Sequence, residues 1–253
     1  MKIIVDAYGG DNAPNEIVEG ALLALEKDKD LEIVLAGKED ELSSILQGRT
    51  DRVSVLAAEE VITNHDVPTV AVRAKKNSSM VKACYELKNN PDVKGIVSAG
   101  STGALLTGAY LIVGRIGGIQ KPALATVLPH LDRKGVVLCD CGANAECRPV
   151  HLEQFAVMGS AFCSAMLGIK NPKVGLLNNG AEECKGDEVH KEAYAFMSKS
   201  NTFNFCGNVE GRDVLSGEAD VVVADCCFSM PRICMHMWLA SITTATPIGL
   251  RAS

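Results

Sequence analysis

The feature that most constrains the fold is an alternation between short apolar runs and longer stretches with helical spacing. The runs are rich in Val and Ile, and several are apolar at consecutive positions, as strands covered on both faces of a parallel sheet are. They lie at Lys2–Ala7, Leu31–Ala36, Val53–Ala57, Gly95–Ala99, Ala123–Leu128, Gly135–Cys139, Lys173–Leu177, Asn204–Gly207 and Asp220–Ala224. Helical spacing appears after Pro14 and again over 78–90, 102–113, 150–167 and 187–199. This order predicts a three-layer α/β fold, a mostly parallel sheet flanked by helices.

No internal repeat or low-complexity linker interrupts residues 1–225, so we expect this range to form one α/β domain. Aromatic residues make up only 4% of the chain, which favours aliphatic strands over a β-sandwich. After Asp225 the composition changes. Cysteines, methionines and the only tryptophan, Trp238, crowd together without a period of 2 or 3.6, so we interpret 226–253 as an atypical tail.

Charge and hydropathy exclude several classes of protein. A formal net charge of -6 argues against a nucleic-acid surface, which needs clustered Lys and Arg. The first residues do not resemble a signal peptide, and no run of about 18 uncharged apolar residues occurs, so a cytoplasmic location is expected. Ten cysteines lie scattered through such a sequence, and most are expected to be buried free thiols.

Ligands of open α/β sheets bind beyond the carboxyl ends of the strands, so the residues that follow each strand are the candidates for chemistry. The first strand is followed by Asp6, Gly9, Gly10 and Asp11. The two glycines permit a tight turn, and Asp11 or Asn12 could cap the helix that starts near Pro14. Capping alone would explain this segment, but two carboxylates and two glycines also suit a binding site.

The turn from Ser98 to Gly103 has the form of a strand, small residues and a helix start. It would aim backbone N–H groups and the hydroxyls of Ser98, Ser101 and Thr102 at one point, which is an anion site in outline. Neither a Walker lysine nor a G-x-G-x-x-G fingerprint is present, so no nucleotide is specified. A well-capped helix is the alternative.

Two later strand ends add polar groups. The segment 139–149 carries Cys139, Asp140, Cys141, Asn144 and Arg148, and its spacing is not that of a zinc site. In 176–186, Asn178 and Lys185 follow a strand within one loop. Lys185 could neutralise a phosphate or the oxyanion of an attacked thioester, or it could simply be a solvated lysine. A last strand end offers Asn208, Glu210 and Arg212.

A basic run, Arg73-Ala74-Lys75-Lys76, precedes a helix that Ser78 or Ser79 could cap. Such a run is usually a solvated face. It could equally receive an acidic carrier protein or a phosphate, with Lys76 as the candidate.

Taken in order, the segments VDAYGGDNAP, KKNSSM, SAGSTGALL, GRIGGIQKPALA, CGANAECRP, QFAVMGSA, VGLLNNGAEECKG and GNVEGRD resemble the bacterial phosphate acyltransferases, which convert acyl-ACP and phosphate to acyl phosphate for phospholipid synthesis. The resemblance covers residues 1–225. It implies an isocitrate/isopropylmalate dehydrogenase-like fold, a homodimer, and no metal or redox cofactor. It also implies peripheral association with the inner face of the cell membrane, beside a glycerol-phosphate acyltransferase.

Within this resemblance, the expected catalytic residues are Lys185, Asn144 and Asn178. The expected phosphate- or substrate-binding residues are Ser98, Gly100, Ser101, Thr102, Gly103, Asp6, Gly9, Gly10, Asp11 and Lys76. Phosphate would attack the acyl thioester directly. Acyl carrier protein would be the partner that carries this acyl group. The alternatives are a phosphotransacetylase-like enzyme that uses acyl-CoA and an inactive truncated copy of the family. The second arises because family members continue differently after Asp225, as a frameshift or truncation would produce.

Overall fold

The structure is a computed structural model that describes residues 1–130 and 135–225. Its contacts divide the chain into two compact units, Met1–Gly117 and Gly118–Ser253, and each unit is described by itself. The division falls inside the range 1–225, where the sequence offered no boundary, and it lies among Gly114, Gly117 and Gly118. The predicted tail, 226–253, lies outside the described residues.

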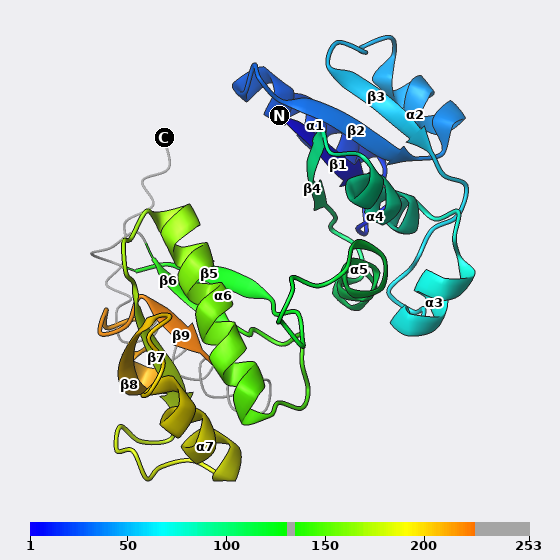
Figure 1. Cartoon of the computed structure of the whole chain (residues 1–253). Helices are drawn as coiled ribbons and strands as arrows, with labels where there is room; N and C mark the ends of the chain where they lie inside the picture. The colour runs from blue at the N-terminus through cyan, green and yellow to red at the C-terminus, as the bar shows by residue number, and fades with distance from the viewer. Residues whose placement is uncertain (131–134, 226–253) are drawn as a thin grey trace, which may run out of the picture. The chain divides into compact units, whose positions relative to one another are not determined.

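The first unit is built on a parallel sheet of four strands in the order β3-β2-β1-β4 (Figure 1). Its elements are β1 (Lys2–Asp6), α1 (Asn15–Lys27), β2 (Glu32–Gly37), α2 (Glu39–Leu46), β3 (Val53–Ala57), α3 (Pro68–Ala74), α4 (Ser79–Asn89), β4 (Val93–Val97), α5 (Thr102–Gly108) and a π-helical turn, Ala109–Val113. Chain connections run from β1 away to β2 and β3, and return to β4 on the other side of β1. The strand order therefore reverses between β1 and β4.

Alternation along the strands gives this sheet two apolar faces. Val5 and Leu35 point toward α1 and α2, whereas their neighbours Ile4 and Ala36 point toward α4. Leu35, Ile4 and Ala36 are fully buried. Because helices cover both faces, the three-layer α/β arrangement predicted from the sequence is confirmed for this unit.

The second unit contains a sheet of five strands in the order β5-β6-β9-β7-β8. Its elements are β5 (Ala125–Leu128), β6 (Val136–Cys139), α6 (Pro149–Leu167), β7 (Lys173–Asn178), α7 (Glu188–Met197), β8 (Asn204–Glu210), a 3-10 turn at Gly211–Asp213, and β9 (Val221–Val223). Among the strands that the structure describes in this unit, only β5 is antiparallel to its neighbour. The long helix α6 packs over β6 and β9 through a core that includes Phe155, Val137 and Val221 (Figure 1).

Most predicted elements are present, and one local prediction is wrong. Helix α1 does begin after Pro14, but neither Asp11 nor Asn12 caps it; Pro14 itself occupies the N-cap position without a side-chain cap. The Glu16 N–H in the first turn bonds instead to the backbone carbonyl of Asn12, at 3.4 Å. No helix in the described parts of the chain has the length and apolar character needed to cross a membrane.

Candidate functional site

In the first unit, polar residues meet at the carboxyl ends of β1 and β4, where the strand order reverses. Asp6 ends β1 and is 2% exposed. The Ser98 hydroxyl, which follows β4, donates to Asp6 Oδ2 at 2.7 Å and accepts from the Gly100 N–H at 3.1 Å. A crevice outside the strand ends at such a reversal is the usual ligand site of an open α/β sheet. The predicted residues Asp6, Ser98 and Gly100 are therefore neighbours.

Gly9 allows this close approach of two loops. A Cβ at Gly9 would lie 2.7 Å from both Gly100 N and Ser98 Oγ, and 2.8 Å from Asp6 Oδ2. These distances are too short for any side chain, so only glycine lets the turn after β1 pack on the turn after β4. Close packing of the two turns therefore requires glycine at position 9, which the sequence alone does not show.

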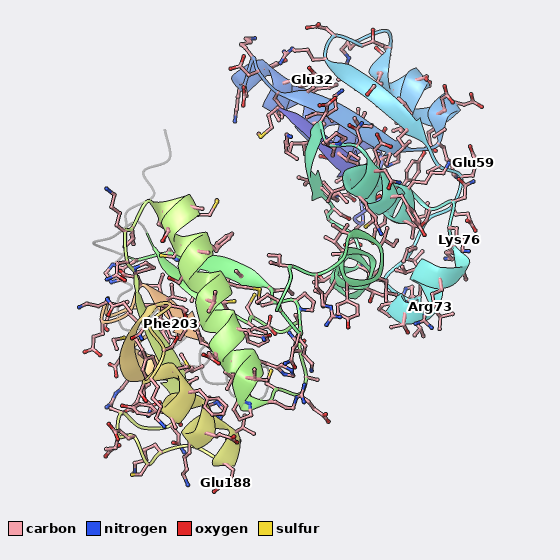
Figure 2. The ribbon with its side chains drawn as sticks, in the orientation of Figure 1. Glu32, Glu59, Arg73, Lys76, Glu188 and Phe203 are labelled. Atoms are coloured by element: carbon pink, nitrogen blue, oxygen red, sulfur yellow. The ribbon has the colours of Figure 1, made fainter. Side chains whose placement is uncertain are left out.

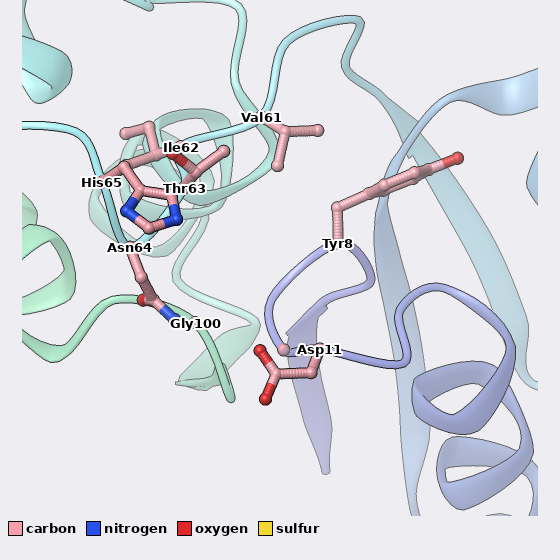
Figure 3. Close-up of a pocket in the computed structure, with 9 residues that line it drawn as sticks. Tyr8, Asp11, Val61, Ile62, Thr63, Asn64, His65 and Gly100 are labelled. Atoms are coloured by element: carbon pink, nitrogen blue, oxygen red, sulfur yellow. The ribbon is translucent and has the colours of Figure 1, made fainter.

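Beside this contact lies a cavity of about 260 Å³ (Figure 3). Its walls come from the turn after β1, the segment before α3 and Gly100. The lining residues are Tyr8, Gly10, Asp11, Val61, Ile62, Thr63, Asn64, His65 and Gly100. Gly10, Asp11 and Gly100 were predicted from the sequence. The segment from 61 to 65 was not, because it lies between recognisable elements and follows no predicted strand.

Tyr8 forms a fixed side wall of the cavity. Its hydroxyl donates to Glu41 Oε2, and the Lys38 ammonium lies 5.6 Å from the ring centroid. Burial, together with the hydrogen bond to the Glu41 carboxylate, raises the pKa of Tyr8 well above its usual value. The hydroxyl therefore stays protonated and is turned away from Asp11, as Figure 3 shows.

At the start of α5, serine hydroxyls of the same segment already accept hydrogen bonds from backbone N–H groups. Ser101 is the N-cap and accepts from the Ala104 N–H at 3.4 Å. Gly103 lies against Pro68 of α3, so its lack of a side chain serves packing. Thr102 is exposed at the first helical position. The N–H groups of Gly100 and Ala104 are thus already bonded within the protein.

The residues of the basic run before α4 have different roles. Lys75 Nζ donates to Asp66 Oδ2 at 2.7 Å and to the Val61 carbonyl at 2.9 Å, so this lysine is part of the framework. Arg73 and Lys76 are exposed on α3 and just after it (Figure 2). Lys76 is not among the residues that line the cavity.

In the second unit, Asp140 organises the loop that follows β6. It is fully buried, and its carboxylate accepts from the N–H groups of Leu124 at 2.8 Å, Ala143 at 3.2 Å and Asn144 at 2.9 Å. Asn144 Nδ2 donates to Asp140 Oδ2 at 3.0 Å and to the Pro122 carbonyl at 2.8 Å. Both amide protons of Asn144 are therefore used in holding the loop, which leaves only its carbonyl oxygen for a substrate.

Asn178 holds the loop that carries Lys185. The Asn178 amide donates to the Lys185 carbonyl at 3.1 Å and to Asn208 Oδ1 at 3.2 Å, while Oδ1 accepts from the Asn179 N–H at 2.8 Å. Gly186 adopts φ +91°, and a Cβ there would lie 2.7 Å from Asn178 Oδ1, so glycine is required. The predicted pair, Asn178 and Lys185, is thus brought together through the backbone.

The Lys185 side chain is exposed and makes no hydrogen bond or ion pair with another residue of the described ranges. In contrast, Arg212 is occupied by Glu210 and Asp213. Lys185 therefore offers an ammonium at the carboxyl end of β7, on a loop that Asn178 fixes. The residues around Asp6 and Ser98 belong to the first compact unit, and those around Asn178 and Lys185 belong to the second.

The buried cysteines of the described ranges do not provide an activated nucleophile. Seven cysteines are described, without a disulfide among them: Cys84, Cys139 and Cys163 are buried, Cys141 and Cys147 are partly buried, and Cys184 and Cys206 are exposed. The expectation that most are buried is therefore met by only three of these seven. Burial raises the pKa of the Cys84 thiol to about 11 and that of Cys139 to about 12. It also raises the pKa of Cys141 and Cys163. These four thiols are therefore protonated and weakly nucleophilic at neutral pH.

Solved structures with a similar fold include two phosphotransacetylases. The EutD phosphotransacetylase of Staphylococcus aureus has a TM-score of 0.67 at 17% identity, over 96% of this chain and 82% of that one. A phosphotransacetylase from Streptococcus pyogenes also has a TM-score of 0.67, at 18% identity, over 96% and 81%. At such low identity these similarities establish the α/β fold alone.

Sequence comparison identifies the family. The family described as "Fatty acid synthesis protein" matches residues 1–231. The phosphate acyltransferase of Bacillus thuringiensis is 48% identical over 225 residues, 89% of this chain and 67% of that protein. The phosphate acyltransferase of Geobacillus thermodenitrificans is 49% identical over 225 residues, 89% of this chain and 68% of its own length. The chain therefore belongs to the phosphate acyltransferase family, a family of transferase enzymes.

Proposed function

We propose that this chain transfers a fatty acyl group from acyl-ACP to inorganic phosphate and so forms acyl phosphate for phospholipid synthesis. The observation that carries the proposal is the 48% identity to a phosphate acyltransferase over 225 residues. We further propose the finer features that the resemblance implies: an isocitrate/isopropylmalate dehydrogenase-like version of the fold, a cytoplasmic homodimer, and peripheral membrane association near a glycerol-phosphate acyltransferase.

In the proposed reaction, a phosphate oxygen attacks the thioester carbonyl carbon, the C–O bond forms and the C–S bond breaks. The sulfur leaves with the electron pair and takes up a proton. No enzyme nucleophile is needed, which agrees with the high pKa values of the buried thiols. Orientation of two bound reactants can lower the barrier by about 7–11 kcal/mol, so a site without a covalent intermediate suffices.

The proposed roles follow from the free groups of each unit. Lys185 offers the positive charge that phosphate and the developing oxyanion need, and Asn178 positions its loop. Asn144 holds the loop after β6, and its remaining carbonyl oxygen could orient a reactant. Ser98, Ser101, Thr102, Gly103 and Lys76 remain proposed phosphate or substrate residues. Gly10, Asp11 and Gly100 line the first-unit cavity.

The test compares donors and a charge variant. The protein should form acyl phosphate from long-chain acyl-ACP and phosphate more efficiently than from acetyl-CoA, as measured by trapping the product with hydroxylamine. Lys185→Ala should lower kcat/KM about 10- to 100-fold because one charge-assisted contact is lost, and Lys185→Arg should retain part of the activity. Lys199→Ala, at another exposed lysine of the second unit, is the control. Equal activity of Lys185→Ala and Lys199→Ala would remove Lys185 from the mechanism.

A further inference from the structure

One wall of the cavity beside Gly100 is a loop whose shape is fixed by an ion pair. Asp66 Oδ2 accepts from the Thr63 N–H at 2.7 Å, the Thr63 hydroxyl at 3.0 Å and Lys75 Nζ at 2.7 Å. Lys75 Nζ also donates to the Val61 carbonyl at 2.9 Å. The segment from Val61 to Asp66 is thereby held at both ends, against α3 and the turn that follows it.

The tip of this braced loop presents two polar side chains that the protein itself does not use. Asn64 and His65 line the cavity and are exposed, and neither side chain has a hydrogen bond or ion pair within the described ranges. In Figure 3 the Asn64 side chain and the Asp11 carboxylate extend toward the cavity from opposite sides. The Asn64 and His65 side chains can therefore still donate or accept hydrogen bonds at the cavity.

The charge of the lining makes it unsuitable for phosphate. No lysine or arginine is among the lining residues, and the one acidic group, Asp11, presents a carboxylate. Asp6, also a carboxyl residue, lies just beneath Gly9 and Ser98. A phosphate placed here would meet like charge without a compensating lysine or arginine.

The size and polarity suit a neutral, slender ligand segment. A cavity of about 260 Å³ lies just below the roughly 300–1,000 Å³ of sites for drug-sized ligands, so it would admit part of a substrate rather than a whole one. Tyr8, Val61 and Ile62 supply apolar walls, and Asn64 supplies both a donor and an acceptor. A chain that alternates methylene groups with amides presents the complementary pattern.

We infer that this cavity binds the amide-containing pantetheine arm that carries the acyl thioester, with Asn64 and His65 as binding residues and the Lys75–Asp66 pair as positioning residues. The inference rests on the proposed function, and it assigns the cavity to the acyl donor rather than to phosphate.

The experiment separates the two substrates by their Michaelis constants in the full chain. Asn64→Ala and His65→Ala should each raise KM for acyl-ACP about 3- to 10-fold, as expected when one hydrogen bond to a neutral group is lost. The KM for phosphate should stay within about twofold. Asn89→Ala is the matched control, because Asn89 is exposed at the end of α4 that precedes β4, away from the carboxyl ends of the strands.

Binding supplies a readout that does not depend on turnover. Free pantetheine should bind the wild-type chain, and Asn64→Ala should weaken that binding by the same factor, as measured by calorimetry. A rise in the phosphate KM instead of the acyl-ACP KM would overturn the inference, and so would unchanged constants in both variants. If wild-type protein forms no acyl phosphate yet binds pantetheine through Asn64, the proposed function fails and the cavity assignment stands.

Discussion

Asp140 is the residue on which the loop after β6 most depends. Its buried carboxylate accepts three backbone N–H groups and the Asn144 amide. Asp140→Ala would leave those donors without their buried acceptor, so we expect a loss of about 3–5 kcal/mol in the free energy of unfolding. Asp140→Asn should cost less, because its amide oxygen still accepts.

Urea denaturation followed by circular dichroism would measure this loss. Glu192→Ala, at an exposed position of α7, should change the free energy of unfolding by no more than about 0.5 kcal/mol. A similarly small change in Asp140→Ala would show that the Asp140 hydrogen bonds are replaced by other contacts.

At the residue scale, the sequence predicted which positions follow the strands but not what each side chain does. Asp6 and Ser98 were predicted as site residues and do meet. Lys76 was the candidate of the basic run, yet Lys75 is the lysine that forms an ion pair, because pairing with Asp66 requires a turn that local sequence does not fix. The signal for the missed loop was Thr63 with Asp66 three residues later, a spacing at which an acidic side chain can bond back to the backbone.

At the scale of single elements, the Thr63–Asp66 turn should depend on pH through Asp66. Hydrogen bonds from Lys75 and Thr63 lower the pKa of Asp66 to about 2. A carboxyl whose folded pKa is depressed stabilises the fold above its unfolded pKa, near 4, and loses this contribution as pH falls toward 2. Wild-type protein should therefore be more stable than Asp66→Asn at pH 7, and most of this difference should be lost by pH 2.

Chemical denaturation of both proteins between pH 2 and pH 7 would show this convergence. Asp92→Asn, at an exposed position before β4, serves as the comparison. A stability difference between wild type and Asp66→Asn that is constant over the whole pH range would contradict the assignment to the Asp66 charge.

Helix α1 should depend on a residue outside it. Arg52 lies just before β3, and its guanidinium donates to the carbonyls of Leu25 at 2.9 Å, Asp28 at 2.9 Å and Leu31 at 3.1 Å. It thus satisfies acceptors at the end of α1 and in the turn that follows. We expect Arg52→Ala to cost about 1–3 kcal/mol and Arg52→Lys to restore only part, because an ammonium cannot span these carbonyls. Thermal unfolding would measure both, with Arg73→Ala, which is exposed on α3, as the control.

Periodicity predicted the long elements well and the short ones poorly. Helix α6 was expected over 150–167 and spans Pro149–Leu167, and α7 was expected over 187–199 and spans Glu188–Met197. Helices α2 and α3 were not predicted. They have eight and seven residues, too few for a repeating apolar face, and α3 exists because Ala71 and Val72 pack in the cluster with α4 and α5. Short helices depend on tertiary packing more than on propensity.

At the scale of the whole molecule, the first unit has what a separate folding domain needs. Both faces of its sheet are covered within 1–117, and Ile4, Leu35 and Leu42 are fully buried. A domain of this size can bury roughly 60–70% of its unfolded surface. We therefore expect residues 1–117 to fold alone and to unfold cooperatively in urea, as observed by circular dichroism and by dispersed amide signals in NMR spectra.

A shorter fragment, residues 1–97, tests whether α5 and the π-helical turn are needed for the stability of the first unit. It keeps every strand of the first sheet but lacks α5 and the π-helical turn, whose Ala104 and Ile112 cover Met80 and Cys84 of α4. That loss exposes apolar surface, so the urea midpoint of 1–97 should fall well below that of 1–117. Equal midpoints would mean that α5 adds nothing to the first unit. A fragment 1–117 without a cooperative transition would mean that this unit depends on the rest of the chain, because its own two apolar faces would then be insufficient to hold the sheet.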